Sequence, residues 1–186
     1  MSEVTSQRGR PSPMMFVSLG IGAVVAIVLI SVVSYFTGGT VTNTQAQSAL
    51  INTKIAPFSA KDTAGVSIKA PWASGHPTVL VFFASWCTAC HSELPAITAY
   101  LKQHALGNIQ VIGIDSLDNT ATGVAFATKS GVTFPILEDG GSITQGDFSF
   151  QGMPDTVFLS GTGVVKAVQN GVISTSTFAS DLALLG

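Results

Sequence analysis

The stretch of residues 79–95 constrains the fold of this chain most. It joins a strand-like apolar run to a segment with helical spacing, and it holds both cysteines. Residues 79–83 form an uninterrupted apolar run of β-branched and aromatic side chains, which is typical of a strand covered on both faces. After Cys87, residues suited to a first helical turn are followed by apolar residues at helical spacing. We therefore predict a buried strand and then a helix that opens at Cys87 and that Pro95 bends from within.

The placement of the two cysteines indicates redox chemistry. A helix N-terminus presents unpaired N–H groups and the positive end of the macrodipole, so a thiolate at Cys87 would be stabilised. Cys90 would lie one turn deeper on the same face, within disulfide distance of Cys87 but less open to a substrate. So small a loop restrains little of the unfolded chain, which makes a purely structural disulfide a poor interpretation. We predict that Cys87 is the nucleophile and Cys90 the resolving thiol.

Four separated motifs occur in the order expected of a known family. They are Phe-Ser-Ala-Lys-Asp-Thr-Ala-Gly at residues 58–65, Trp-Cys-Thr-Ala-Cys-His-Ser-Glu-Leu-Pro at 86–95, Phe-Pro-Ile-Leu-Glu-Asp at 134–139 and Gly-Met-Pro-Asp-Thr-Val-Phe-Leu at 152–159. The chain resembles the thioredoxin superfamily, and its Glu-Leu-Pro tail is similar to that of the membrane-anchored thiol-disulfide oxidoreductases of the TlpA/ResA/CcmG(DsbE) group. The resemblance implies a thioredoxin-like α/β fold, a three-layer sandwich with a central mixed sheet flanked by helices.

The resemblance also implies roles for residues near the cysteines. Glu93 would be an acid that influences thiol ionisation and transfers a proton, and Met153 and Pro154 would form a cis-proline loop that binds substrate. Trp86 would cover the exposed side of the disulfide and contact substrate. From the residues alone, Glu93 could equally be an ordinary first-turn glutamate, Pro154 a trans turn residue and Trp86 a core residue. Because Val81 stands where thioredoxins carry a buried aspartate, Glu93 is expected to be the only buried acid.

Residues 87–91, Cys-Thr-Ala-Cys-His, also match the pattern of c-type haem attachment. In that interpretation the chain would be an electron-transfer cytochrome, with His91 and Met153 as axial ligands. A preceding buried strand and Trp86 give haem attachment no advantage, so we favour a dithiol site with no cofactor and no metal. In that site His91 either tunes the neighbouring thiolate or faces solvent.

The rest of the domain predicts alternating strands and helices, then an antiparallel hairpin and a last helix. The expected strands are 58–60, 66–69, 109–114, 156–159 and 164–168, and the expected helices are 120–130 and 175–185. Asp115 and Asp118 should cap the helix at 120–130. Glu138 and Asp139 should form a turn rather than a metal site.

The N-terminal part of the chain has a separate organisation. Residues 14–36 are 23 mostly apolar residues without a charge, about 35 Å long as a helix and enough to cross a hydrocarbon core of about 30 Å. Arg8 and Arg10 precede them, so the positive-inside bias puts the N-terminus in the cytoplasm. We predict a cytoplasmic tail at 1–13, a single-pass transmembrane anchor at 14–36, a flexible linker at 37–54 and an extracytoplasmic domain at 55–186. A cleaved signal peptide is the alternative.

An exported dithiol can be oxidised and can persist as a disulfide, which suits thiol-disulfide exchange. The resemblance implies a reductant of exported proteins with cysteine pairs, such as apocytochrome c during cytochrome c maturation. A membrane electron donor of the CcdA or DsbD type would keep it reduced. An oxidase that inserts disulfides into exported proteins is the close alternative. The formal net charge of −2 gives no reason to expect nucleic acid as a partner.

Overall fold

The computed structural model describes residues 49–150 and 152–186. The predicted tail at 1–13, the predicted anchor at 14–36 and most of the predicted linker therefore lie outside the described residues. Within the described ranges, no helix combines the length and the apolar character that a membrane crossing requires.

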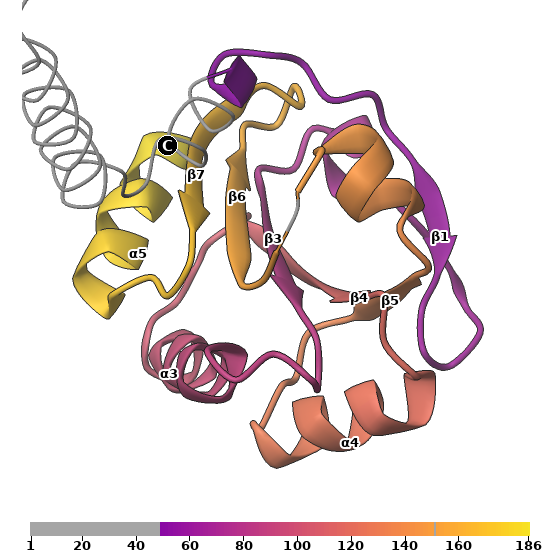
Figure 1. The fold of residues 1–186 in the computed structure, drawn as a ribbon. Coiled ribbons are helices and arrows are strands. Elements are labelled where there is room, and N and C mark those ends of the chain that lie inside the picture. The colour runs from indigo at the N-terminus through magenta and orange to yellow at the C-terminus, as the bar shows by residue number, and fades with distance from the viewer. Residues whose placement is uncertain (1–48, 151) are drawn as a thin grey trace, which may run out of the picture. The chain divides into compact units, whose positions relative to one another are not determined.

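A five-stranded mixed sheet forms the centre of the domain (Figure 1). Its order is β5–β4–β3–β6–β7, with β3 at Thr78–Phe83, β4 at Gln110–Ser116, β5 at Ile136–Asp139, β6 at Asp155–Leu159 and β7 at Val165–Asn170. β3 is parallel to β4 and antiparallel to β6, β4 is parallel to β5, and β6 is antiparallel to β7. All residues of β3 are buried, which explains why its sequence is a continuous apolar run without alternation.

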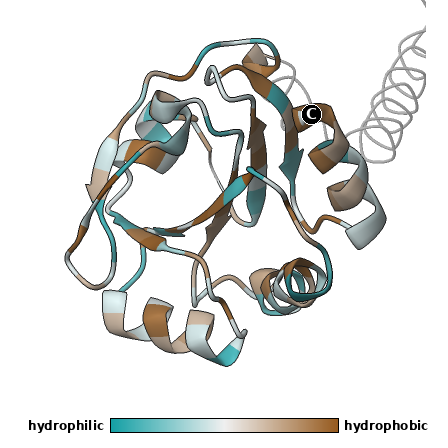
Figure 2. Cartoon of the chain, turned by 180° about the vertical axis from the view of Figure 1, so that it is seen from behind, coloured by the Kyte–Doolittle hydropathy of each residue, from teal (hydrophilic) through white to brown (hydrophobic). Residues whose placement is uncertain are grey.

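Three α-helices cover one face of this sheet. They are α3 at Cys90–Gln103, α4 at Thr120–Lys129 and α5 at Thr175–Leu182, which continues into the short 3-10 helix η3 at Ala183–Leu185. Val79 and Phe83 of β3 belong to one buried cluster with Leu94, Phe126 and Phe178 of the three helices. The units β3–α3–β4 and β4–α4–β5 run in the same direction along the sheet, so right-handed crossovers put α3 and α4 on the same face. Figure 2 shows hydrophobic residues on the strands and on parts of these helices.

The opposite face of the sheet is covered by shorter elements. They are the hairpin of β1 at Ser59–Lys61 and β2 at Ser67–Lys69, the 3-10 helix η1 at Pro71–Ser74 and the π-helix η2 at Ser142–Asp147. Leu80 and Phe82 of β3 pack in this second buried cluster. The ring of Phe82 lies edge-on to the rings of Phe148 and Phe150, with centroids 5.1 Å apart in each pair. The three layers of the predicted sandwich are therefore present, and the third is built from short pieces.

The first residues of the domain lie along both edges of the sheet. Lys54 forms an antiparallel bridge with Val164, next to the start of β7, and Asp62 forms one with Leu137 of β5. Leu50 packs against the buried cluster on the second face. The described end of the predicted linker therefore contacts the domain.

Each predicted strand and helix has a counterpart within two residues of its expected bounds, apart from the start of the active-site helix and the end of the last one, where α5 stops at Leu182 and η3 completes the predicted span to residue 185. That helix, α3, begins at Cys90 rather than at Cys87. Residues 87–89 instead form a tight turn, in which Cys90 N donates a hydrogen bond to Cys87 O at 3.1 Å. Pro95 lies inside α3, as predicted.

Strand β5 and helix η2 have no counterpart among the predicted elements. Glu138 and Asp139, expected to form a turn, are instead the last residues of β5. Asp139 is buried, and its carboxylate accepts hydrogen bonds from Ile143 N at 3.0 Å and Thr144 N at 2.8 Å. These bonds hold the pKa of Asp139 below its usual value although burial works against this. The acid therefore stabilises the start of η2.

The predicted caps of α4 are wrong. Its N-cap is Asn119, which has extended backbone angles and accepts a hydrogen bond from Ala121 N at 3.0 Å through its side chain. Asp115 lies too early to cap, because it is a buried residue of β4. Asp118 precedes the cap by one residue, and its carboxylate accepts hydrogen bonds from Ser85 as well as from Asn119 N and Thr122 Oγ1.

Candidate active site

The two cysteines form a disulfide where β3 leads into α3. Their sulfur atoms are 2.07 Å apart. Cys87 is 5% exposed and Cys90 is fully buried, so Cys87 is the more accessible of the two. Cys90 N donates a hydrogen bond to Cys87 Sγ at 3.1 Å. In the reduced protein the same N–H group would stabilise a thiolate on Cys87.

Trp86 stands in solvent beside the disulfide and is not a core residue. Its side chain is 57% exposed. The indole Nε1 donates a hydrogen bond to the backbone oxygen of Leu117 at 3.1 Å, which fixes the orientation of the ring. Leu117 is itself exposed and has a positive φ of 53°, uncommon for a residue with a branched side chain. An ordered aromatic surface therefore adjoins Cys87.

The peptide bond between Met153 and Pro154 is cis. Met153 is half-buried and packs against the cluster that contains Cys87 and Cys90. Pro154 is buried directly before β6, and its backbone oxygen accepts a hydrogen bond from Gly171 N at 2.8 Å. The loop before β6 thus meets the cysteine cluster from a different part of the chain.

Glu93 lies in the first turn of α3 and is almost fully buried. Its Oε1 accepts a hydrogen bond from Ile173 N at 2.9 Å. Burial raises the pKa of Glu93 to about 7, and the bond from Ile173 only partly opposes this. The carboxyl group can therefore exchange a proton near neutral pH, which an exposed first-turn glutamate would not do.

Asp155 is a second buried acid that the sequence analysis missed. It directly follows Pro154, and its carboxylate accepts a hydrogen bond from Asn170 Nδ2. Burial raises the pKa of Asp155 to about 7 against this hydrogen bond, and the charge of Glu93 raises it further. Asp155 lies within the motif at 152–159, where a carboxyl at the start of a mostly apolar strand was the available signal.

The expectation that Glu93 is the only buried acid is therefore wrong. Asp115, Asp139 and Asp155 are each only 3% exposed. Val81 indeed leaves no acid in the central strand, but the neighbouring strands β4, β5 and β6 each contribute one. Long-range packing, rather than position in the motif, decides which carboxyl groups are buried.

His91 is exposed yet held in place. Its Nε2 lies 2.9 Å from Ser85 O, and its ring centroid lies 4.4 Å from that of Phe126. These contacts do not fit haem attachment. Thioethers would need both cysteine sulfurs, which are bonded to each other, and the Nε2 atom that would bind iron already contacts a backbone oxygen.

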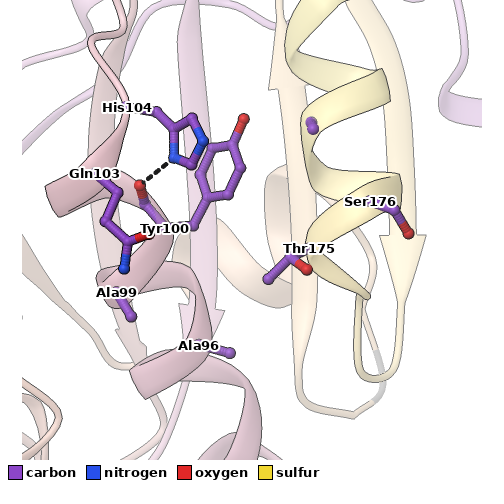
Figure 3. Close-up of a pocket in the computed structure, with 8 residues that line it drawn as sticks. Ala96, Ala99, Tyr100, Gln103, His104, Thr175 and Ser176 are labelled. Carbon is purple, nitrogen blue, oxygen red and sulfur yellow. Dashed lines mark hydrogen bonds between the residues drawn. The ribbon is translucent and has the colours of Figure 1, made fainter.

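A separate groove of about 540 Å³ lies between α3 and α5 (Figure 3). On one wall Tyr100 and His104 stack with ring centroids 3.9 Å apart. Thr175 and Ser176 line the other wall. Neither the cysteines nor the buried acids are among its lining residues, so the groove is distinct from the candidate active site.

The fold and the paired cysteines define the chain as a thioredoxin-like thiol-disulfide oxidoreductase. The AhpC/TSA family model matches residues 51–168. The chain belongs to the AhpC/TSA family.

Individual relatives agree with this assignment. The chain is 30% identical over 130 residues to the thioredoxin-like protein YneN of Bacillus subtilis (strain 168), covering 68% of this chain and 75% of YneN. It is 27% identical over 127 residues to the thiol:disulfide interchange protein DsbE of Escherichia coli (strain K12), covering 66% of each. The solved structure of MTB dsbF superposes with a TM-score of 0.62 at 27% identity, covering 69% of this chain and 95% of dsbF. The resemblance to the group that includes DsbE is thereby confirmed.

Proposed function

We propose that the chain is a membrane-anchored, extracytoplasmic reductant that exchanges electrons with disulfides of exported proteins through Cys87 and Cys90. The observation that carries the proposal is the asymmetry of the pair: Cys87 is slightly exposed, whereas Cys90 is fully buried in the same first turn of α3 as the buried acid Glu93. Thiol-disulfide exchange needs one thiolate that meets the substrate and a second thiol that the substrate cannot reach, and the resemblance to the TlpA/ResA/CcmG(DsbE) group supports the reducing direction.

The reaction would proceed in two displacements. The Cys87 thiolate attacks a substrate disulfide, which forms a mixed disulfide and releases one substrate thiolate. Cys90 then loses its proton, and its thiolate attacks the Cys87 sulfur. The second substrate thiolate leaves, so the substrate gains two electrons and the enzyme disulfide reforms.

Glu93 and Asp155 would take the proton from Cys90. Both carboxyl groups are buried and have a pKa of about 7, so either is able to accept a proton at neutral pH. Because they interact electrostatically, they would titrate as a pair rather than independently. A buried carboxyl group, rather than a water molecule, would then accept the proton of Cys90 when the mixed disulfide is resolved.

Trp86, Met153 and Pro154 would bind the substrate around the open sulfur. The exposed indole offers an apolar surface, and a flexible thioether next to the disulfide adapts to different side chains. Such contacts suit a segment of an exported polypeptide that carries a cysteine pair.

The anchor at 14–36 and the basic residues Arg8 and Arg10 support the extracytoplasmic location. The similarity to DsbE supports exchange with protein thiols, and apocytochrome c is the substrate that the resemblance suggests. A membrane electron donor of the CcdA or DsbD type would reduce the pair again. Protease added to cells with an intact cytoplasmic membrane, but without an outer membrane or cell wall, should cleave the domain and spare residues 1–13.

The direction of electron flow is tested by the reduction potential of the Cys87–Cys90 pair in the full chain. The protein is equilibrated in a series of redox buffers, its free thiols are alkylated, and its mass is measured to give the reduced fraction at each potential. A value near or below about −250 mV would support a reductant, and one towards about −120 mV would support the oxidase alternative. A mass that includes haem, with no two-electron couple, would overturn the proposal.

A further inference from the structure

The connection between β4 and α4 holds the turn that presents Cys87. Asp118 accepts hydrogen bonds from both Ser85 N and Ser85 Oγ, the latter at 2.9 Å. The residue before it, Leu117, accepts the bond from Trp86 Nε1. Two consecutive residues of this connection therefore bind the two residues that precede Cys87.

Ser85 has no polar atom left over. Its N and Oγ bind Asp118, and its backbone oxygen lies 2.9 Å from His91 Nε2. The serine lies two residues before the open cysteine, so its position sets where the turn of residues 85–87 lies. A side chain from the connection between β4 and α4 thus fixes the entry to α3.

Asp118 is itself rigidly placed. It also accepts hydrogen bonds from Asn119 N at 2.7 Å and from Thr122 Oγ1 at 3.2 Å, both at the start of α4. Partial burial would raise the pKa of Asp118, but the bonds from Ser85, Asn119 and Thr122 outweigh it and hold the pKa below its usual value. The group is an anion throughout the neutral range.

We propose that Asp118 is a positioning residue of thiol-disulfide exchange, which holds Ser85 in place and keeps a fixed negative charge beside the turn that carries Cys87. The inference rests on the proposed function. Asp118 contacts neither sulfur and acts through Ser85.

The charge has a predictable direction of effect. An anion near Cys87 opposes formation of the thiolate and so favours the disulfide over the reduced pair. Other titratable groups act nearby: burial, Asp118 and Glu138 of β5 raise the pKa of Asp115 on β4, and His91 on α3 contacts Ser85. Of the three acids Asp115, Asp118 and Glu138, Asp118 is the one that is hydrogen-bonded to the turn of residues 85–87.

Three variants of the full chain in detergent test the charge and the hydrogen bonds of Asp118. Asp118→Asn removes the charge and leaves one acceptor oxygen, so it can no longer accept from Ser85 N and Ser85 Oγ through separate oxygens. Ser85→Ala keeps the charge and removes one hydrogen bond. Comparison of these two variants therefore isolates the effect of the charge. Asp62→Asn is the matched control, since Asp62 also accepts two backbone hydrogen bonds in a turn, from Ala64 and Val66, beside the edge strand β5.

Asp118→Asn should shift the equilibrium with glutathione towards the dithiol by about tenfold and lower the pH midpoint of Cys87 alkylation. Ser85→Ala should leave that midpoint unchanged and slow reduction of a substrate disulfide at equal thiolate concentration. Thermal unfolding of each variant checks that the fold is intact.

The inference is overturned if the equilibrium and the alkylation midpoint of Asp118→Asn equal those of Asp62→Asn. A purely structural role for Asp118 would lower the unfolding temperature and leave both redox readouts unchanged. If the unaltered chain shows no two-electron couple, the proposed function fails, and this outcome is visible before any variant is compared.

Discussion

Glu93 Oε1 accepts a hydrogen bond from Ile173 N at 2.9 Å across a sequence separation of 80 residues. This bond joins the first turn of α3 to the segment between β7 and α5. It leaves the carboxyl group buried with a single hydrogen bond to the backbone, which is why its pKa lies near 7 rather than near 4.

Glu93→Gln should change how the thiols ionise while keeping the fold. Glutamine retains an oxygen for Ile173 N but cannot accept a proton. The pH profile of alkylation of the reduced pair should therefore shift, and resolution of a mixed disulfide should slow by about a hundredfold. An alkylation profile identical to that of the unaltered chain would remove the acid from the mechanism.

The same substitution should act on the second buried acid. The charge of Glu93 helps to raise the pKa of Asp155, so Glu93→Gln should lower that pKa from about 7. Carboxyl carbon shifts measured by NMR across pH values of 4 to 9 would follow Asp155 directly. An unmoved titration of Asp155 would show that the two carboxyl groups do not interact.

Cys90→Ser should trap substrates, and Cys87→Ser should not. Without the buried thiol the mixed disulfide on Cys87 cannot be resolved, so covalent complexes with substrate proteins should accumulate. They can be isolated without reducing agent and identified by mass spectrometry. Complexes that form equally with Cys87→Ser would reverse the assigned roles of the two cysteines.

Stability should fall as the pH rises towards 8. Glu93, Asp115 and Asp155 each have a pKa raised to about 7, so the folded state binds protons that the unfolded state releases near pH 4. Their stabilising effect is complete below about pH 4 and is lost as the pH passes 7, by at most about 4 kcal/mol for one group. Thermal unfolding of the oxidised chain at pH 5 and at pH 8 measures this. The slope should be smaller in Glu93→Gln.

Gly123→Ala should destabilise the domain although alanine favours helices. A Cβ atom on Gly123 of α4 would lie 1.8 Å from Asp115 Oδ2. Moving a buried carboxylate should cost about 1 to 3 kcal/mol, more than the roughly 1 kcal/mol of helix propensity gained. Gly146→Ala, which meets nothing within 4 Å, is the control in urea unfolding. Equal stability of the two variants would mean that Asp115 moves without cost.

The β3–α3 junction could be predicted from the sequence because its signals are local. An apolar run, a Cys-x-x-Cys spacing and helical periodicity all lie within residues 79–103. Strand β5 could not be predicted in this way, since only Ile136 and Leu137 are apolar and its pairing with β4 supplies the rest.

The polar part of the site was less accessible to sequence reasoning for a related physical reason. Asp155 is buried by strands on both sides, and Asp118 meets Ser85 across 33 positions of the chain. Neither contact leaves a pattern in the sequence around the residues that make it. Asp118 resembles a helix cap because it stands next to one, but its carboxylate binds the distant Ser85 as well as the start of α4.

The bridges of Lys54 and Asp62 to the two outer strands bear on how the domain behaves alone. A bare outer strand offers unpaired N–H and C=O groups with which another chain can pair. A fragment that began after residue 66 would lose both coverings. We expect such a fragment to self-associate, whereas one that began before Leu50 should stay monomeric.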